Sequence, residues 1–159
     1  MNALIIFAKT PVKGKVKTRL QENLSQTNVL KLYKEFLLQT VYTAKKVRNC
    51  KKIIACYPDE NHPYLKTLAI KFGFQLIKQH GRDLGDRMKN AITDFLNDGN
   101  KKVVIIGCDS PALPKEYIEK AFYVLNKKSL VIGPSCDGGY SLIGVRGVTP
   151  PIFNDIKFG

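Results

Sequence analysis

The sequence predicts an α/β fold of three layers (α/β/α), with helices on both faces of a mainly parallel sheet and one late antiparallel strand. Two observations support this prediction. First, short apolar runs alternate along the chain with segments whose apolar residues recur every three or four positions, which are the patterns of buried strands and amphipathic helices. Second, residues 103–106 are β-branched throughout, which is typical of a strand covered on both faces in the middle of a parallel sheet.

Three apolar segments in the N-terminal half predict strands, at residues 3–8, 52–57 and 74–77. The last alternates only loosely between apolar and polar residues, which favours a place at or near a sheet edge. Residues 28–47 form the clearest helix, because their apolar side chains share one face. A second, short helix is expected with Asn61 as its cap, Pro63 in its first turn and Gly73 at its end.

The C-terminal half continues the same alternation. Its expected elements are a helix that ends near Asn97, the strand at 102–106, a helix opened by Pro114, and strands at 129–133 and 140–145. Gly99 is a suitable stop for the first of these helices. The short connection between the last two strands implies that they are antiparallel, while the earlier strand–helix–strand units imply right-handed crossovers.

Composition predicts one globular domain with a strong positive charge. A chain of 159 residues can bury a core without disulfides. It has 26 Lys and Arg against 13 Asp and Glu, a formal net charge of +13. This excess favours anionic partners, among them nucleotides, phosphorylated substrates, nucleic acid and acidic membrane surfaces, and does not choose among them. A generally basic proteome would produce the same excess without such a partner.

Cysteine and histidine usage argues against several site types. None of the four cysteines forms a C-x-x-C pair, so a zinc ribbon and a thioredoxin motif are excluded. Cys56 and Cys108 are expected to be buried thiols in a reducing cytoplasm. The only histidines, His62 and His80, lie in different loops and are expected to be surface or capping residues. No segment has the roughly 20 apolar residues of a membrane span, and the N-terminus lacks the pattern of a signal peptide.

A cationic loop is predicted at the carboxyl end of the first strand. Residues 9–19 contain five cations and no acidic residue, namely Lys9, Lys13, Lys15, Lys17 and Arg19. Because ligands bind at the carboxyl edge of open α/β sheets, this loop is expected to bind phosphates, with Arg19 as a fork of donors and the lysines as point charges. The alternative is a solvated basic loop. Neither the P-loop spacing G-x-x-x-x-G-K-[ST] nor a G-x-G-x-x-G motif is present.

An acidic residue follows the central strand directly. Asp109 comes after Gly107, and Pro111 prevents the strand from continuing. The carboxylate is therefore expected at the carboxyl edge of the sheet, where, with phosphates nearby, it suits Mg²⁺ or Mn²⁺. The alternative is that Asp109 only caps the turn into the next helix.

Two further segments carry acidic residues next to glycines. Residues 81–87 place Asp83 beside a helix N-terminus, which suits a wall for a base or ribose, or alternatively a plain helix cap with a turn. Asp137 precedes two glycines in a predicted tight turn, and is either a second acidic group of the site, as base or metal contact, or only a turn-forming residue. We expect the cationic loop, Asp83, Asp109 and Asp137 to converge on one edge of the sheet.

Several short motifs occur in the order found in a known family. They are Phe7-Ala8-Lys9 with Pro11 and Gly14, residues 16–20, Asp83-Leu84-Gly85 with Arg87-Met88, residues 107–111, and Gly133-Pro134 with residues 137–140 and 142–144. In this combination the chain, from Leu4 to about Gly159, resembles the GT-A-fold transferases of the radical-SAM/selenodomain-associated type, often labelled arsenosugar-biosynthesis glycosyltransferases. More distantly, Lys9 with residues 17–20 resembles the lactate-phosphate guanylyltransferases of deazaflavin cofactor synthesis and the molybdenum-cofactor guanylyltransferases.

The resemblance implies a nucleotide-diphospho-sugar transferase-like fold, Mg²⁺ or Mn²⁺, a nucleotide sugar or nucleoside triphosphate, and a small-molecule acceptor. It implies that Asp109 binds the metal and that Asp109 and Asp137 are catalytic. The residues it implies for nucleotide binding are Phe7, Ala8, Lys9, Gly14, Lys17, Thr18, Arg19, Asp83, Gly85 and Arg87. Those it implies for acceptor binding are Gly138, Gly139 and Tyr140.

The expected function is that of a metal-dependent glycosyltransferase in the cytoplasm. The alternatives are guanylyltransferase-like nucleotidyl transfer to a phosphorylated small molecule, and a non-catalytic nucleotide-binding protein. Members of the family continue beyond the position of Gly159 with a helix, a strand and an Asp-rich segment, so the resemblance implies a single domain over residues 1–159 that lacks these parts. A basic nucleic-acid-binding domain is a further alternative, but no zinc finger, aromatic RNA-binding strand motif or recognition-helix pattern is present, so no nucleic acid is expected as partner.

Overall fold

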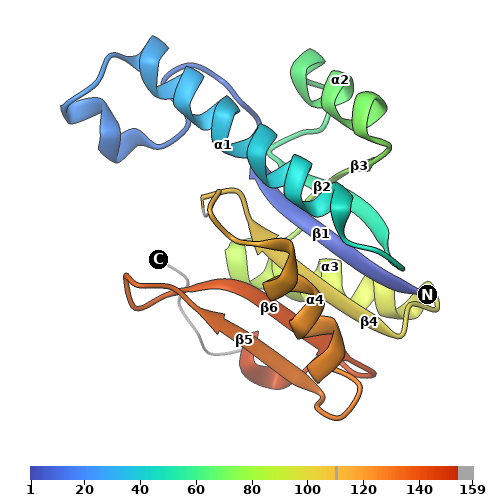
Figure 1. Ribbon diagram of the computed structural model, residues 1–159. Coiled ribbons are helices and arrows are strands. Elements are labelled where there is room, and N and C mark those ends of the chain that lie inside the picture. Colours follow the sequence, from blue (N-terminus) through green and yellow to red (C-terminus); the bar gives the residue numbers. More distant parts are fainter. Residues whose placement is uncertain (110, 154–159) are drawn as a thin grey trace.

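The computed structural model describes residues 1–109 and 111–153, in which strands and helices alternate along the chain (Figure 1). The strands are β1 (Asn2–Lys9), β2 (Lys51–Tyr57), β3 (Gln75–Lys78), β4 (Lys102–Gly107), β5 (Leu130–Pro134) and β6 (Tyr140–Arg146). The helices are α1 (Gln26–Lys46), α2 (Pro63–Phe72), α3 (Leu84–Asn97) and α4 (Lys115–Val124), with short 3-10 helices η1 (Thr18–Glu22) and η2 (Pro151–Phe153).

The strands form one sheet in the order β3-β2-β1-β4-β6-β5. Strand β1 pairs in parallel with both β2 and β4, so that Ile5 lies opposite Ile53 and Ile105. Strand β3 is an edge strand parallel to β2, and β6 is antiparallel to both of its neighbours. The prediction of a mainly parallel sheet with one late antiparallel strand is therefore confirmed, and so are the interior place of β4 and the edge place of β3.

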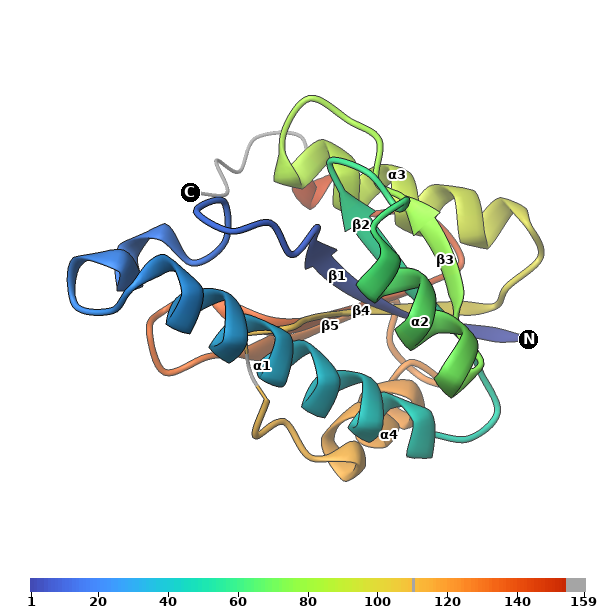
Figure 2. The same ribbon diagram turned by 90° about the horizontal axis from the view of Figure 1, so that it is seen from above.

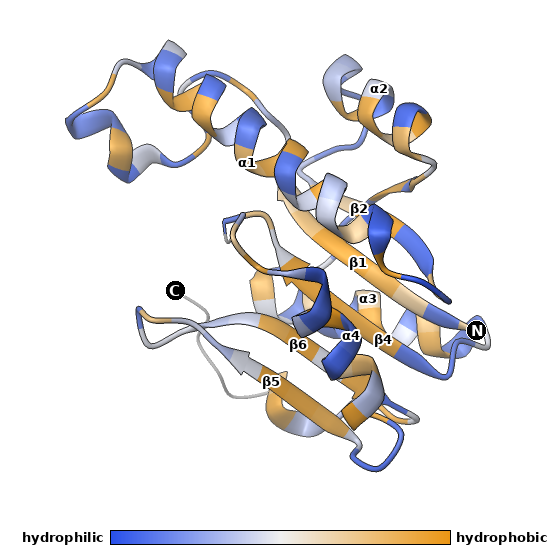
Figure 3. Cartoon of the chain, in the orientation of Figure 1, coloured by the Kyte–Doolittle hydropathy of each residue, from blue (hydrophilic) through white to orange (hydrophobic). Residues whose placement is uncertain are grey.

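Helices cover both faces of this sheet, which confirms the three-layer architecture. Alternate residues of β1 enter two separate cores, because side chains alternate across a strand. Leu4 and Ile6 pack with α1, α2 and α4, whereas Ile5 and Phe7 pack with α3 and η2. Figure 2 shows α1 and α4 on one side of the sheet and α3 on the other. In Figure 3, β1 and β4 are hydrophobic along most of their length, as expected for strands covered on both faces.

The ends of α2 show one correct and one wrong prediction. Gly73 ends the helix in the left-handed conformation with φ 73°, as expected. Asn61 was expected to be the cap, but the cap is His62, whose Nδ1 accepts the N–H of Tyr64 at 3.2 Å. Asn61 instead donates its backbone N–H to the carboxylate of Asp59 at 2.7 Å, because the chain turns one residue later than predicted.

Other element boundaries differ from the predictions by one or two residues. Phe74 was expected to open the third strand, but it precedes β3 and packs in the core below α1 and α2. His80 lies on the surface, as predicted, and pairs with Asp94 at 2.7 Å. Among residues 1–109 and 111–153, no helix combines the length and apolar character that a membrane crossing requires.

Candidate functional site

The loops that carry the predicted site residues gather at one edge of the sheet. Strands β1, β2, β3 and β4 are parallel, so their carboxyl ends meet at the same edge. Strand β5 ends there as well, because β6 is antiparallel to both β4 and β5. Figures 1 and 2 both show the loop after β1, the loop after β4 and the β5–β6 hairpin at the same end of the molecule. We refer to this end as the carboxyl edge.

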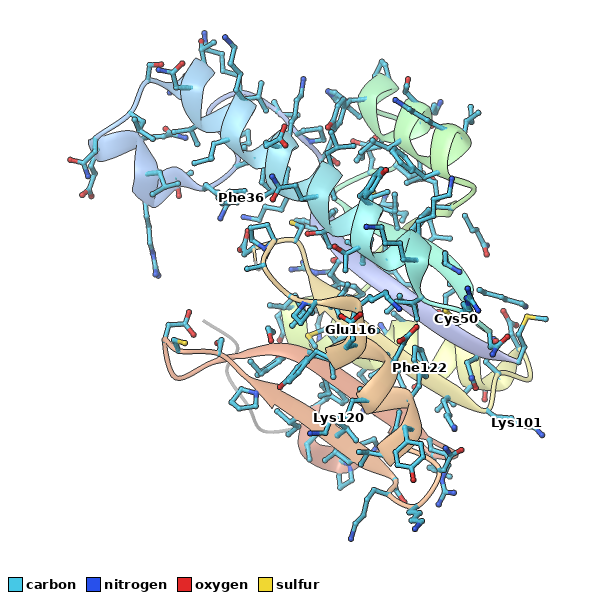
Figure 4. All side chains as sticks on the ribbon, in the orientation of Figure 1. Phe36, Cys50, Lys101, Glu116, Lys120 and Phe122 are labelled. Atoms are coloured by element: carbon cyan, nitrogen blue, oxygen red, sulfur yellow. The ribbon has the colours of Figure 1, made fainter. Side chains whose placement is uncertain are left out.

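At this edge the structure joins the cationic loop to the predicted metal-binding carboxylate. The Lys17 ammonium lies 2.9 Å from the Asp109 carboxylate. It also lies 5.1 Å from the centroid of the Phe36 ring, which is labelled on α1 in Figure 4. The Lys17 side chain is 18% exposed, whereas that of Asp109 is 72% exposed. The lysine is thus held in place from two sides, and the carboxylate remains accessible to a ligand.

The backbone of the cationic loop explains how Lys17 reaches this position. The side chain of Val16 is buried in the core beneath α1 and anchors the loop to the sheet. Gly14 and Lys17 on either side have φ values of 77° and 43°. A left-handed conformation costs a residue with a Cβ roughly 1 kcal/mol or more, so Lys17 is held there by its surroundings. The buried valine and the two left-handed residues together turn the chain into η1.

A buried hydroxyl on α1 fixes the ends of the two central strands. The Tyr33 hydroxyl accepts the N–H of Lys9 and donates to the carbonyl of Lys9, both at 2.8 Å. The Cys108 thiol donates to the Tyr33 hydroxyl oxygen at 3.5 Å. Burial raises the pKa of the Tyr33 phenol above its usual range and that of the Cys108 thiol to about 11, so both groups are protonated donors at neutral pH. Tyr33 therefore links the last residue of β1 to the residue that precedes Asp109.

Gln79 fixes the other side of the edge. Its side chain is buried, and its amide donates to the carbonyls of Ala55 at 2.7 Å and Ala8 at 3.3 Å. Its backbone N–H is donated to the carbonyl of Cys56 at 2.8 Å. One residue therefore joins the carboxyl ends of β1, β2 and β3. Sequence reasoning placed Tyr33 only among the apolar side chains of the helix at residues 28–47, and it overlooked Gln79, whose only signal was a polar residue soon after the predicted strand at 74–77.

The loop before α3 combines a helix cap with an aromatic contact. Asp83 accepts the N–H of Asp86 at 2.8 Å, so the helix-cap interpretation of Asp83 describes what the structure shows. The Arg87 guanidinium lies 4.0 Å from the ring centroid of Tyr57 at the end of β2, and its Nε is buried without a hydrogen-bond partner among the described residues. Gly81 has φ 142°, and a Cβ there would lie 2.7 Å from the backbone nitrogen of Arg87. This loop is thus closely packed against α3.

The remaining residues predicted for nucleotide binding occupy three kinds of position. The side chains of Phe7 and Ala8 are buried in β1, so they support the edge from below. Gly85 is buried in the first turn of α3. Thr18 and Arg19 are exposed on η1, which Figures 1 and 2 show at the outer end of the cationic loop, away from the sheet.

Asp137 acts as a turn residue in the β5–β6 hairpin. Its carboxylate accepts a hydrogen bond from the Ser135 hydroxyl and another from the N–H of Gly139 at 3.1 Å. The Ser135 bond is the main reason why the pKa of Asp137 is lowered. A lowered pKa makes the carboxylate a weaker base, because general bases work best with a pKa near the working pH. These hydrogen bonds and the lowered pKa of Asp137 therefore favour its interpretation as a turn-forming residue over that of a general base.

The residues predicted for acceptor binding continue this hairpin. Gly138 has φ 85°, which a glycine adopts without strain, and Gly139 follows it in the turn. The hydroxyl of Tyr140, at the start of β6, contacts the sulfur of Met88 on α3 at 3.5 Å. Burial raises the pKa of Tyr140 to about 12. Tyr140 thus brings the hairpin against α3, on the opposite face of the sheet from α1.

The side chains near Asp109 suit a metal ion only if phosphates and water supply most of its ligands. Among residues 1–109 and 111–153 there is no group of three or more His, Cys, Asp or Glu side chains that could hold a metal. Magnesium is often held by one or two carboxylates, with substrate phosphates and water as the other ligands. The exposed Asp109 carboxylate fits that mode, provided that a phosphate ligand is present and Lys17 gives way.

Two hollows in the described part of the chain lie along the helices that flank the sheet. One of about 240 Å³ lies between α3 and strands β2 and β3, with Arg87, His80 and Asp94 in its lining. The other, of about 380 Å³, lies between α1 and Pro111. Neither is lined by Lys17 or Asp109. The Lys17–Asp109 pair is therefore part of an open surface that a ligand would have to cover.

A comparison with protein families supports a shared origin for most of this chain. The model of a family described as "Uncharacterized protein conserved in bacteria (DUF2064)" matches residues 40–159. A search of curated proteins gives no match.

Solved structures share the fold. A provisionally named nucleotide-diphospho-sugar transferase from Desulfovibrio desulfuricans G20 is 32% identical, with a TM-score of 0.89 over 99% of this chain and 69% of that one. The 4-diphosphocytidyl-2C-methyl-D-erythritol synthase of Anaerococcus prevotii is 13% identical, with a TM-score of 0.63 over 92% of this chain and 71% of that one. A cytidylyltransferase from Leptospira borgpetersenii is 12% identical, with a TM-score of 0.56 over 91% and 60%. These similarities confirm the predicted nucleotide-diphospho-sugar transferase-like fold.

Proposed function

We propose that this chain, which belongs to the DUF2064 family of proteins conserved in bacteria, is a transferase that uses a nucleotide-activated donor, with glycosyl transfer as its reaction. The family description assigns no activity, so the proposal depends on the carboxyl edge. The name of the Desulfovibrio relative, a nucleotide-diphospho-sugar transferase, supports the same class of donor, because that protein is 32% identical and matches 99% of this chain.

The observation that carries the proposal is the contact between Lys17 and Asp109. It brings a half-buried cation and an accessible carboxylate together across the ends of the adjacent strands β1 and β4. A diphosphate needs both kinds of group, because its oxygens bind cations directly and its metal ion needs a protein carboxylate. In open α/β sheets, this edge is where ligands bind.

The cationic loop would bind the phosphates of the donor. Lys9 lies at the end of β1 and Lys17 beside Asp109, while Arg19 is exposed on η1. Arg19 would add paired donors that match phosphate oxygens, and the lysines would act as point charges. When the donor's leaving group departs with extra negative charge, these cations would stabilise that charge.

Asp109 would hold Mg²⁺ or Mn²⁺ against the diphosphate. The metal, when bound, neutralises charge on the leaving phosphate. For the metal to bind, Lys17 and Asp109 must exchange partners. In the structure the Asp109 carboxylate is paired with Lys17, so a bound donor would draw the lysine to its phosphates and free the carboxylate.

The other predicted residues take roles at the two sides of the donor. The loop from Asp83 to Arg87, with the Arg87–Tyr57 stack, would border the base or ribose. The hairpin with Asp137 and Tyr140 would face the acceptor. Because the pKa of Asp137 is lowered, we assign it a contact with the acceptor or the metal, and leave proton removal to another group.

A thermal-shift screen of nucleotides and nucleotide sugars, with and without Mn²⁺, tests the proposal. A ligand at a hundred times its Kd stabilises the native state by about 2.7 kcal/mol, which raises the midpoint of a chain of this size by about 5 to 10 °C. The Asp109→Asn variant should keep its fold and lose the Mn²⁺-dependent part of the shift. Asp98→Asn, at the C-terminal end of α3, is the matched control. If Asp109→Asn responds like the wild type, the metal role of Asp109 is wrong.

Nucleotidyl transfer is the second candidate, because the Anaerococcus and Leptospira enzymes share the fold. In that reaction a phosphorylated small molecule would attack the α-phosphate of a nucleoside triphosphate and release pyrophosphate. Product analysis distinguishes the two: glycosyl transfer releases a nucleoside diphosphate, and nucleotidyl transfer releases pyrophosphate. Binding without either product would indicate a non-catalytic nucleotide-binding protein.

A further inference from the structure

A basic surface with aromatic and aliphatic side chains lies on the outer side of α1 and α2. Four lysines of α1 and two of α2 are accompanied by a single acidic residue, Glu35. At the C-terminal ends of the two helices, three of these lysines lie next to apolar side chains, of which Tyr42 and Ile70 are exposed and Phe72 is half-buried. We define this α1–α2 patch by six residues: Tyr42, Lys45, Lys46, Ile70, Lys71 and Phe72.

The two rings and the three lysines of the patch contact one another, and Ile70 precedes Lys71 on α2 as an exposed side chain. The rings of Tyr42 and Phe72 meet edge to face with centroids 6.0 Å apart, which joins the two helices. The Lys46 ammonium lies 4.8 Å from the Tyr42 ring, and those of Lys45 and Lys71 lie 5.4 and 5.6 Å from the Phe72 ring. The aromatic faces are therefore covered by cations whose positive charge still faces solvent.

Helix ends alone do not explain this surface. Lysines in the last turn of a helix stabilise its C-terminal dipole, which would account for Lys45, Lys46 and Lys71. It does not account for Ile70, which is 84% exposed, or for Tyr42, which is 56% exposed. Exposed apolar side chains next to several lysines suit a partner that offers both negative charge and apolar contacts.

The patch lies away from the proposed donor site. Helices α1 and α2 return the chain from the carboxyl ends of β1 and β2 to the starts of the next parallel strands, so both end at the opposite edge of the sheet. Figure 1 shows α1 and α2 side by side in the upper part of the molecule, and Figure 2 shows their C-terminal ends far from the loops of the carboxyl edge. A partner on the patch would leave the carboxyl edge open.

We propose that the α1–α2 patch binds the surface of an anionic lipid bilayer. Lysines attract acidic headgroups, and their long aliphatic stems can lie against the acyl region while the ammonium stays in water. Tyr42 and Ile70, the exposed apolar side chains of the patch, would enter the interface, where aromatic and aliphatic side chains add affinity. Nucleic acid fits less well, because bases stack on open aromatic faces, whereas here the rings of Tyr42 and Phe72 are covered by lysines and Ile70 offers no stacking face.

Cosedimentation with vesicles tests this proposal. Vesicles of equal parts phosphatidylcholine and phosphatidylglycerol should bind the full chain, those of phosphatidylcholine alone should not, and added salt should weaken binding. Each lysine near an anionic surface adds roughly a fivefold gain in affinity. The variant Lys45→Gln/Lys46→Gln/Lys71→Gln should therefore bind about a hundredfold more weakly.

Two further variants distinguish the patch from general charge. The matched control Lys120→Gln/Lys127→Gln/Lys128→Gln removes the same charge from exposed positions on and after α4, where Lys120 is labelled in Figure 4, and should bind almost as well as the wild type. Ile70→Ser should bind more weakly without any change in charge. Equal losses in the patch and control variants would overturn the proposal. So would a wild-type chain that ignores anionic vesicles, including one that instead binds RNA or DNA in a salt-dependent way.

Discussion

The Tyr33 hydroxyl can be removed without changing the shape of the core, and its loss tests whether α1 holds the carboxyl edge in place. In Tyr33→Phe the ring keeps its packing against β1 and β4. The N–H and the carbonyl of Lys9 both lose a partner at 2.8 Å, and the Cys108 thiol loses its acceptor. The variant therefore affects three polar groups at the ends of the two central strands.

The expected magnitude follows from these contacts. A hydrogen bond contributes about 1 kcal/mol net, and a buried group left without a partner costs about 1 to 3 kcal/mol. Water can reach part of Lys9, which is exposed, so the Lys9 groups will recover part of the loss. We therefore expect the free energy of unfolding to fall by about 2 kcal/mol, and the thermal midpoint to fall by about 4 to 8 °C for a chain of this length.

Urea unfolding followed by circular dichroism measures this change. The midpoint concentration should fall while the slope of the transition stays the same, because the same surface is exposed on unfolding. Tyr123→Phe is the control, since that ring is 69% exposed on α4 and its hydroxyl should contribute little. A Tyr33→Phe variant within about 0.5 kcal/mol of the wild type, the usual range of a neutral surface substitution, would show that the hydroxyl does not hold the edge.

Three further predictions concern residues of the same edge. In a double-mutant cycle by urea unfolding, Lys17→Met and Asp109→Asn should couple by less than about 1 kcal/mol, because the exposed carboxylate is screened by water; a larger coupling would mean that the pair stabilises the fold. Gly81→Ala should cost more than about 2 kcal/mol, because a Cβ would clash with the backbone of α3 in addition to the strain of its positive φ, whereas Gly99→Ala, with open space around it, should cost only about 1 kcal/mol. Burial raises the pKa of the Cys108 thiol from its ordinary 9.0 to about 11, so its contribution to stability is complete below pH 9 and is lost as the pH rises from 9 through 11, where the unfolded chain releases a proton that the native state keeps. Unfolding measured across this range should show a steeper fall for the wild type than for Cys108→Ala, and parallel curves would contradict the assignment.

The features that sequence reasoning predicted correctly depend on local patterns. The β-branched run at residues 103–106 is typical of a buried strand, and Gly73 has the left-handed conformation that ends a helix. The meeting of Lys17 and Asp109 follows from the same patterns, because loops after neighbouring parallel strands must share an edge. The convergence of predicted residues was thus accessible without coordinates, although their chemical roles were not.

The features that it missed depend on contacts between distant parts of the chain. The Tyr33 hydroxyl reaches a backbone group 24 residues away, and the Gln79 amide reaches one 71 residues away. No periodicity encodes such bonds, since they require the tertiary structure to bring the backbone groups within reach. The wrong cap on α2 has a different cause. Asn61 and His62 can both accept a backbone N–H, and the choice depends on where the preceding loop turns.

The net charge of +13 becomes informative only when its location is known. Lys17 is 18% exposed, lies against an aromatic ring and faces a carboxylate, which are the surroundings of a cation held for a specific ligand. Lys45, Lys46 and Lys71 are exposed at helix ends and lie over the rings of two aromatic side chains. Such an arrangement suits a broad surface contact. One excess of charge is thus divided between two edges of the sheet with different neighbours. Nucleotide binding should therefore depend on the first group, and vesicle binding on the second, so that each can be removed without the other.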